Sequence, residues 1–439
     1  MDNYLDIFRK KAELQRDLKM ESLPLGSSCV WLVYYESIVN IQESIAYIWH
    51  SEIMPADSYN DICTRLSGKE WSIKDVNDLQ QGRLVVIDAD GDRAFSFLGK
   101  LNELARSLDK PDNESMPFSP SIAFMEPMST NIGLLRQAMN SPALVAEGLT
   151  FQGAVTTKEA SLVYHADRVD PELLRQVRRS LQDASGKDVI NAQDLIAIFG
   201  GNRFELLTPF YKTEIPIQAV TSMLGGRVIL LVDGEPAAYV LPLLFCDFTS
   251  LAWDRQLPLI LMYSIRYLRL LSMVIGLMIP GLYVALVSVN PETLRIELAL
   301  SVASSRIGIP LPTFLEMLFL LIVSEISIES TQRLPKGIAG SITVIGGIVL
   351  GTAIVDAKLV SSLVIIVLSI SVTAGFAFPN YINTLSIRLL RVAIVVLSGI
   401  FGVLGLFAGY IAICFYICSI ERFGIPFMSF LDFRKLGKS

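Results

Sequence analysis

The chain has 439 residues, of which 52% are hydrophobic and 18% are charged, and its formal net charge at pH 7 is −6. This acidic balance argues against nucleic acid as a partner, because phosphate neutralisation needs a basic surface. Five cysteines without a C-x-x-C spacing and two distant histidines argue against a disulfide framework, a zinc site and a histidine-based catalytic centre, so we expect no enzyme activity, no metal and no cofactor.

The charged residues are spread unevenly. Residues 270–420 contain 13 of them, about 9% of that segment, whereas the rest of the chain is charged like an ordinary soluble protein. This split indicates a soluble N-terminal part followed by membrane helices, and it excludes a wholly soluble enzyme, a disordered chain and a small disulfide scaffold. The charged N-terminal segment lacks the apolar core of a secretory signal, so we expect the soluble part to stay in the cytoplasm.

The soluble part repeats one plan twice. A short amphipathic helix is expected over residues 4–19. The first copy then has a strand over Cys29–Tyr35, a helix over Ile41–Trp49 and a β-hairpin over Gly82–Leu98, where two β-rich runs flank an Asp-Gly turn.

The second copy has the same pieces in the same order. A strand is expected over Ala160–His165 and a helix from Asp170 to about Asp183, with Pro171 suited to its first position. A second hairpin covers Gly226–Leu241. Both hairpins begin with Gly-Arg, continue with an apolar run and turn at Asp and Gly. Two α/β subdomains of similar build are the main interpretation, and a chance similarity of two hairpins is the alternative.

A loop rich in Pro, Asp, Asn and Ser over 109–120 separates the copies, and a helix is expected over 130–140. The expected fold class is therefore α/β followed by an all-α membrane part. Its domains are a first α/β subdomain at 1–128, a second at 129–250, and a transmembrane helical domain with a short tail at 251–439.

Apolar runs in the last part are long enough to cross about 30 Å of hydrocarbon. The expected spans are 270–289, 338–355, 359–378 and 392–418.

A further apolar helix over 312–329 carries three glutamates. A charge in hydrocarbon costs at least about 2.5–3.5 kcal/mol, so this helix is expected to line water, pack on protein or lie in the interface. Basic residues favour a cytoplasmic location for both ends of the membrane part: Arg255, Arg266 and Arg269 precede the first span, and a basic tail follows the last. Four spans satisfy this condition. Five spans are the alternative.

Polar side chains on the apolar helices are the candidates for function. The candidate ion-pathway residues are Glu316, Glu325, Glu329, Ser362, Ser369 and Thr373. The last three share one helical face, as pore-lining groups would. The alternatives are acids that lie in headgroup water and a stripe that packs helix on helix. The candidates for gating or packing are Pro280, Gly351, Pro379, Asn380, Arg388 and Arg391.

A series of short motifs is distributed along these elements. They include Asn131–Arg136, Gly226–Pro236, Ile265–Arg269, Pro280–Leu286, Ala303–Arg306, Arg333–Pro335, Pro379–Tyr381, Ile387–Arg391 and Ser419–Gly424. In these motifs the chain resembles the GerA family of spore germinant-receptor A subunits, well over residues 129–430 and less over 20–128. Glu36-Ser37 stands where the family has Asp-Gly, and Leu321 and Thr352 stand where it often has acids.

The resemblance implies a multi-pass subunit in the inner membrane of the bacterial spore, with its N-terminal half in the cytosol. It implies partnership with a permease-like B subunit and a lipoprotein C subunit in a complex that senses nutrients and triggers germination. It also implies an oligomeric, ligand-gated cation channel, with a pentamer suspected. A non-conducting scaffold and a secondary-transporter component are the alternatives, although the inverted repeats of a transporter are not visible. Neutralising Glu316 and Glu325 is expected to alter ion release.

Overall fold

The computed structural model describes residues 4–25, 28–51, 59–72, 75, 77–102, 122–184, 186–201, 205–334, 344, 347–349, 351–377 and 381–429. The chain divides into two compact units. The first unit comprises Met1–Leu244, Arg422–Ile425 and Ser429–Ser439, and the second comprises Phe245–Glu421 and Pro426–Met428. The loop predicted over 109–120 and the candidates Pro379 and Asn380 lie outside the described residues.

The first unit contains two five-stranded sheets with the same strand order. The first sheet is β1 (Leu18–Leu25), β2 (Ser28–Tyr35), β4 (Arg83–Ile87), β5 (Ala94–Leu98) and β3 (Lys69–Glu70), in that spatial order. The second is β6 (Leu144–Gln152), β7 (Thr157–His165), β9 (Val228–Val232), β10 (Ala238–Leu241) and β8 (Tyr211–Thr213). The shared order confirms that the two hairpins belong to a repeated subdomain and are not a chance similarity.

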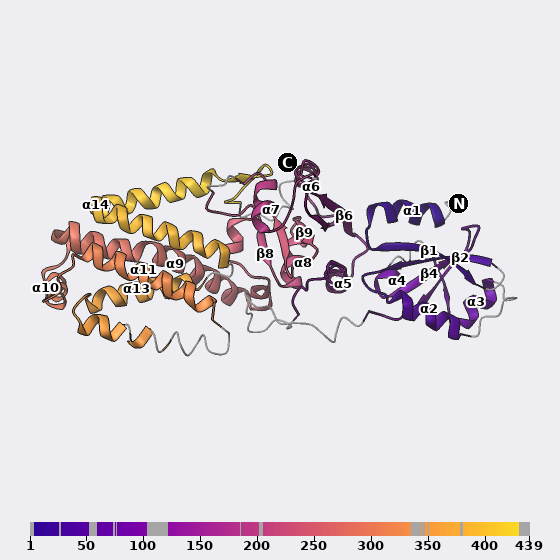
Figure 1. Ribbon diagram of the computed structural model, residues 1–439, viewed down its shortest axis with the longest axis horizontal. Coiled ribbons are helices and arrows are strands. Elements are labelled where there is room, and N and C mark those ends of the chain that lie inside the picture. Colours follow the sequence, from indigo (N-terminus) through magenta and orange to yellow (C-terminus); the bar gives the residue numbers. More distant parts are fainter. Residues whose placement is uncertain are drawn as a thin grey trace. The chain divides into compact units, whose positions relative to one another are not determined.

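The helices repeat as well (Figure 1). The first subdomain has α1 (Tyr4–Leu14), α2 (Ile41–His50), α3 (Tyr59–Arg65) and α4 (Asn77–Gln80), and the second has α5 (Met128–Met139), α6 (Pro171–Gln182), α7 (Ala192–Ile198) and α8 (Pro216–Leu224). Asp170 caps α6 by accepting the Glu172 N–H at 2.9 Å, and Pro171 opens the helix as predicted. The first helix ends before the predicted residue 19, because Leu18–Leu25 pairs along its whole length with β2.

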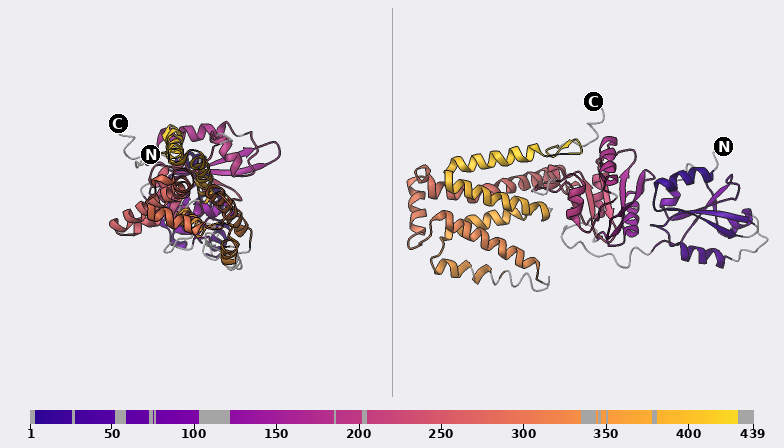
Figure 2. Two further views of the ribbon diagram at one scale, coloured as in Figure 1. Left: turned by 90° about the vertical axis from the view of Figure 1, so that its left-hand side faces the viewer. Right: turned by 45° about the horizontal axis from the view of Figure 1, so that its top comes forward.

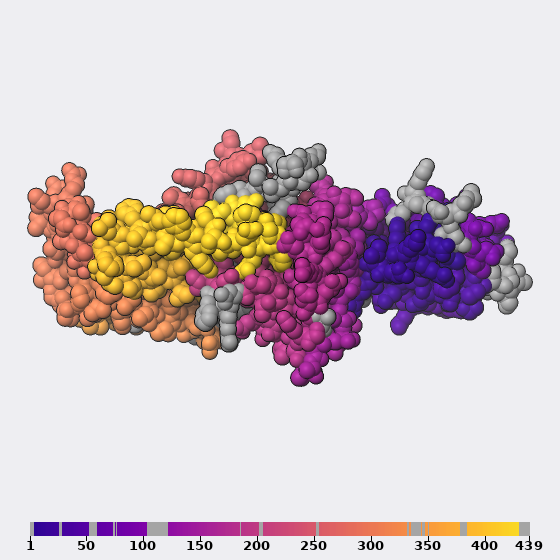
Figure 3. All heavy atoms as spheres, turned by 90° about the horizontal axis from the view of Figure 1, so that it is seen from above, coloured from indigo at the N-terminus to yellow at the C-terminus, as the bar shows by residue number. Residues whose placement is uncertain are grey.

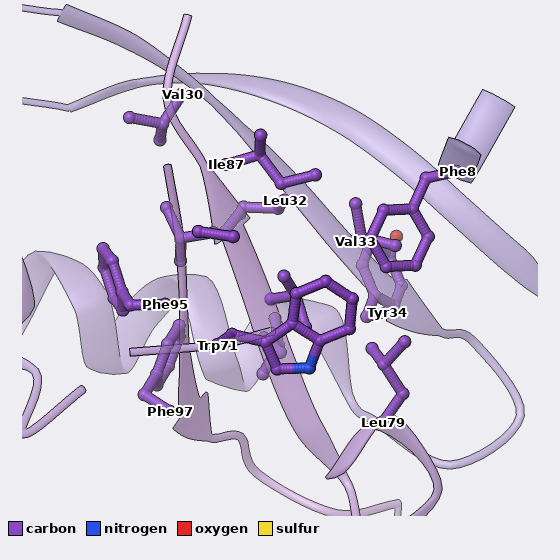
Figure 4. Close-up of a cluster of buried hydrophobic side chains, with 14 of the residues drawn as sticks. Phe8, Val30, Leu32, Val33, Tyr34, Trp71, Leu79, Ile87, Phe95 and Phe97 are labelled. Carbon is purple, nitrogen blue, oxygen red and sulfur yellow. The ribbon is translucent and has the colours of Figure 1, made fainter. Parts of the chain in front are cut away.

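The central strands explain why the hairpins were visible in the sequence. β4 and β9 are buried along almost their whole length, and a strand covered on both faces appears as a continuous apolar run. In the first subdomain, α1 closes the core from one side. Its Phe8 ring lies 5.3 Å from the Trp71 ring, centroid to centroid, above the buried side chains of β2 and β4 (Figure 4).

The second unit is built from helices. It contains η2 (Phe245–Phe248), η3 (Ala252–Gln256), α9 (Leu259–Val284), its π-helical continuation η4 (Ala285–Val289), η5 (Pro291–Thr293), α10 (Ile296–Ser305), α11 (Thr313–Gln332), the apolar helix Gly347–Asp356, α13 (Ser362–Gly375) and α14 (Tyr381–Ser419). β11 (Glu421–Arg422) and β12 (Ile425–Pro426) follow. α9, α11, α13 and α14 pack against one another as a bundle (Figures 1 and 2).

Two described helices are long and apolar enough to cross a membrane, Leu259–Val289 and Thr384–Ser419. The predicted span 270–289 lies within the first of them. The predicted span 359–378 corresponds to the 14-residue helix α13. Much of the predicted span 338–355 lies outside the described residues.

The segment predicted as one span over 392–418 is not a continuous helix. Gly402 has φ 62° and ψ −140°, which is not helical, and it divides α14 into two arms. A Cβ on Gly405 would lie 2.1 Å from the Leu397 carbonyl oxygen, so the arms fold back on each other (Figures 1 and 2). The second arm, yellow in Figure 3, leaves Leu404 and Phe407 exposed on the surface of the unit.

Candidate functional site

Glu316, near the start of α11, is fully buried in an ion pair. Its Oε1 lies 2.9 Å from the Arg306 guanidinium, and its Oε2 accepts a 2.9 Å hydrogen bond from the Ser361 backbone N–H. Ser361 is the N-cap of α13. A negative charge is favoured at a helix N-terminus, where backbone N–H groups lack helical partners. Glu316 therefore fastens the start of α13 to α11.

Glu325 lies farther along α11 and contacts two arginines of α14. Its carboxylate oxygens are 2.9 Å from Arg388 and 2.8 Å from Arg391. The Arg391 side chain is only 3% exposed. An unpaired charge at such a position costs several kcal/mol, so Glu325 supplies the charge that makes this burial possible.

Glu329 differs from the other two acids. It is exposed and pairs at 2.8 Å with Arg333, one turn further along the same helix. Glu316 and Glu325 are separated by about two and a half helical turns, which places them on opposite sides of α11. The three acids therefore do not form one acidic face in the single chain. Their part in an ion pathway stays a prediction.

Ser362, Ser369 and Thr373 of α13 are all exposed in the single chain. The opposite side of the helix, with Val364 and Leu368, packs into the bundle. The predicted polar stripe is therefore the side of α13 that its own chain leaves open. This side is available to water or to another helix.

The candidates for gating or packing have different surroundings. Pro280 is buried inside α9, and a Cβ on the adjacent Gly281 would lie 2.8 Å from Ile394 and Ser398 of α14. This position therefore serves the close approach of α9 and α14. Gly351 faces open space.

A buried ion pair that we did not predict fixes the start of the helical unit. Asp254, in η3, is fully buried and accepts two hydrogen bonds from Arg269 of α9, at 2.7 and 3.0 Å. Arg269 also donates to the Thr249 carbonyl at 2.8 Å. This fork-shaped pairing holds the short helices before α9 against α9 itself. The sequence signal was the Ile265–Arg269 motif, but nothing in it identified Asp254 as the partner.

The last segment of the second unit, Pro426–Met428, contacts the start of the same unit. The Phe245 N–H donates to the Phe427 carbonyl at 2.9 Å. The Phe427 ring packs edge-on against Phe245 and Phe248, at 6.1 and 5.9 Å between centroids. The first and last segments of the unit are thus joined by a small aromatic cluster.

The hairpin residues just before Phe427 pack within the first unit. Arg422 donates to the Gly200 carbonyl at 2.9 Å and forms an ion pair with Glu205. The Phe423 ring lies 6.0 Å from the Phe199 ring. These contacts account for Arg422 and Phe423 in the Ser419–Gly424 motif.

Another buried ion pair joins the two α/β subdomains. Arg136 of α5 is 1% exposed, and its guanidinium donates to both carboxylate oxygens of Asp17, at 2.6 and 2.7 Å. The same guanidinium stacks on the Tyr35 ring at 3.8 Å, and Asp17 also accepts from the Ser37 hydroxyl at 2.7 Å. Burial would lower the pKa of Arg136, but the charge of Asp17 raises it above its usual value. Burial raises the pKa of Tyr35.

The first and last residues of the Asn131–Arg136 motif both make structural contacts. Asn131 accepts the Met125 N–H at 2.7 Å and donates back to the Met125 carbonyl, which holds the segment before α5. Arg136, one turn and a half along the helix, reaches Asp17 in the other subdomain. The motif therefore positions α5 at one end and fastens the first subdomain at the other.

Together these features define a class of protein: a duplicated α/β unit continuous with a bundle of apolar helices whose buried charges are held in ion pairs. Residues 6–437 match the family described as Bacillus/Clostridium GerA spore germination protein. The chain belongs to this GerA family.

Two curated relatives agree with the family match. Spore germination protein B1 of Bacillus subtilis (strain 168) is 31% identical over 448 residues, covering 98% of this chain and 92% of that protein. Spore germination protein GerLA of Bacillus cereus is 29% identical over 361 residues, covering 82% and 73%. The crystal structure of the N-terminal domain of the A subunit of the Bacillus megaterium spore germinant receptor GerK3 aligns with a TM-score of 0.40 and 21% identity, covering 55% of this chain and 94% of that chain.

Proposed function

We propose that the protein is the A subunit of a nutrient-responsive germinant receptor and has no enzymatic activity. In this proposal it is a multi-pass protein of the spore inner membrane, with its α/β unit in the cytosol. It assembles with a permease-like B subunit and a lipoprotein C subunit. Copies of it form a closed pentameric ring. This ring releases cations when a nutrient binds. Membership of the GerA family supports the role in germination.

The observation that carries the channel proposal is the open side of α13. Ser362, Ser369 and Thr373 place hydroxyl groups along an otherwise apolar helix, opposite the side that packs. Hydroxyls gain nothing from facing acyl chains, but in a pore they replace part of an ion's hydration. A ring of copies would bring the same side of each α13 to a common axis. The competing explanation is that these hydroxyls pack helix on helix between copies.

The helix directions also support a revised number of membrane crossings. α9, α11, α13 and both arms of α14 run side by side, and α11 is a continuous 20-residue helix. Together with the predicted 338–355 span they make six crossings instead of four. An even number keeps both ends of the helical unit on one side, as the positive-inside rule requires for Arg255, Arg266 and the basic tail.

The first test is conductance. The full chain is purified, reconstituted in phosphatidylethanolamine–phosphatidylglycerol liposomes and studied by single-channel recording in KCl, with and without a mixture of amino acids and sugars as candidate nutrients. Ser369→Ala and Thr373→Val keep the volume of the side chain but remove the hydroxyl, and we expect each to lower potassium conductance at least about twofold. Ser327→Ala is the control, because Ser327 of α11 is exposed but donates to the Val323 carbonyl at 2.8 Å.

Three outcomes separate the alternatives. Conductance that falls in the two α13 variants and not in Ser327→Ala supports α13 as the lining helix. Conductance that is equal in all variants removes α13 from the pathway. A protein that forms oligomers in mild detergent but conducts no ions either with or without the nutrient mixture is a scaffold, and the channel proposal is then wrong.

A further inference from the structure

A continuous series of polar contacts links four helices of the bundle. Glu325 of α11 pairs with Arg388 and Arg391 of α14, at 2.9 and 2.8 Å. Arg391 also donates to the Ser371 hydroxyl of α13 at 3.2 Å. That hydroxyl in turn donates to the Gly276 carbonyl of α9 at 2.6 Å. We refer to Glu325, Arg388, Arg391, Ser371 and Gly276 as the polar cluster.

Stability alone does not account for this cluster. Ser371 is fully buried and Arg391 nearly so, and buried ion pairs are often no more stabilising than well-packed apolar side chains of the same volume. Such groups do impose one arrangement, because the hydrogen bonds and ion pairs between them form in a single register of the helices. Arg391 satisfies Glu325 and Ser371 together only while α11, α13 and α14 keep their present positions.

The polar cluster contacts α13 through Ser371, on the same stretch of helix as the exposed hydroxyl groups. Ser371 lies between Ser369 and Thr373 in the sequence, but it points into the bundle while they are exposed. Any rotation of α13 that changes how Ser369 and Thr373 are presented must therefore break the bonds of Ser371 to Gly276 and Arg391. A Cβ on Gly276 would lie 3.3 Å from the Ser371 carbonyl, so α9 and α13 are also in close contact here.

We propose that the polar cluster is the lock that keeps the helices in the resting, non-conducting arrangement. Opening requires α13 to turn, and the cluster opposes this turn until nutrient binding compensates for the lost bonds. The proposal rests on the proposed function, because it assumes that the open side of α13 lines the ion pathway. In this proposal Glu325 does not bind the ion. It positions Arg391, which in turn holds Ser371 of α13.

The test compares variants without any nutrient. Glu325→Gln removes the charged acceptor of both arginines, and Ser371→Ala removes the bridge to α9 while keeping every charge. We measure potassium efflux from liposomes that contain the full chain, and hydrogen exchange of the α13 amides in the same samples. Efflux is expected to rise about tenfold in Glu325→Gln, and by a smaller factor in Ser371→Ala. Exchange in α13 is expected to rise in both.

Glu297→Gln is the matched control, because Glu297 is an exposed glutamate of α10 that belongs neither to the polar cluster nor to the candidate ion pathway. It is expected to leave efflux and exchange unchanged. Wild-type efflux and wild-type exchange in both cluster variants would overturn the lock. If Glu325→Gln reduces the amount of folded protein, efflux and α13 exchange in Ser371→Ala alone decide whether the lock exists. Faster exchange in α13 with no efflux from any sample would show that the polar cluster holds α13 in place but that the protein is not a channel.

Discussion

Replacing Arg136 by methionine is expected to lower the free energy of unfolding of the α/β unit by about 3–5 kcal/mol, because it leaves the Asp17 carboxylate buried without its partner. Asp17 is 4% exposed and Arg136 is 1% exposed, so water does not compensate for the loss. The expected site of loosening is the first sheet, where β1 begins directly after Asp17. Hydrogen exchange of the β1 and β2 amides in the full chain measures the effect.

A matched variant separates the buried pair from a general effect of losing an arginine. Arg175 of α6 forms an exposed pair with Glu172 at 2.8 Å, and Arg175→Met is expected to change stability by less than about 0.5 kcal/mol. The double variant Asp17→Leu with Arg136→Met should regain most of the lost stability, because an apolar pair needs no charge compensation. Equal amide protection in Arg136→Met and Arg175→Met would show that the pair does not hold the subdomains together.

The α/β unit could be predicted from the sequence wherever local signals were strong. The Asp-Gly turns and the apolar runs of β4 and β9 identified both hairpins, and Asp170-Pro171 identified the start of α6. The edge strands β1 and β6 were not predicted, because one face of an edge strand can be polar and its pattern is then weak. The pairing of Arg136 with Asp17 could not be predicted either, because the two residues are 119 positions apart in the sequence.

In the helical unit, composition identified the apolar helices but not their partners. The acids of α11 were recognised as costly in hydrocarbon, and the structure pairs Glu316 and Glu325 with arginines from other elements. Pairing of this kind depends on tertiary register, which periodicity in one sequence does not encode. The reversal at Gly402 was missed for another reason: a glycine within an apolar run is common in membrane helices and does not by itself mark a turn.

The turn at Gly402 depends on the absence of a side chain. A Cβ there would lie 2.0 Å from Asn290 Oδ1 and 2.9 Å from Val289 Cγ1. The Asn290 oxygen accepts the Val403 N–H at 3.0 Å, so it caps the first turn of the second arm from the end of η4. Gly402 therefore provides the reversal and also the space in which Asn290 reaches the new helix.

Gly402→Ala is accordingly expected to destabilise the helical unit by roughly 3 kcal/mol, the sum of a strained backbone and a displaced cap. Asn290→Ala removes only the cap and should cost about 1 kcal/mol. Gly347→Ala is the control, since a Cβ at Gly347 meets no atom within 4 Å. Thermal unfolding in detergent should therefore rank the variants Gly402→Ala, Asn290→Ala and Gly347→Ala, from least to most stable. If Gly402→Ala were as stable as Gly347→Ala, α14 would not reverse at residue 402, and the six-crossing arrangement would lose its basis.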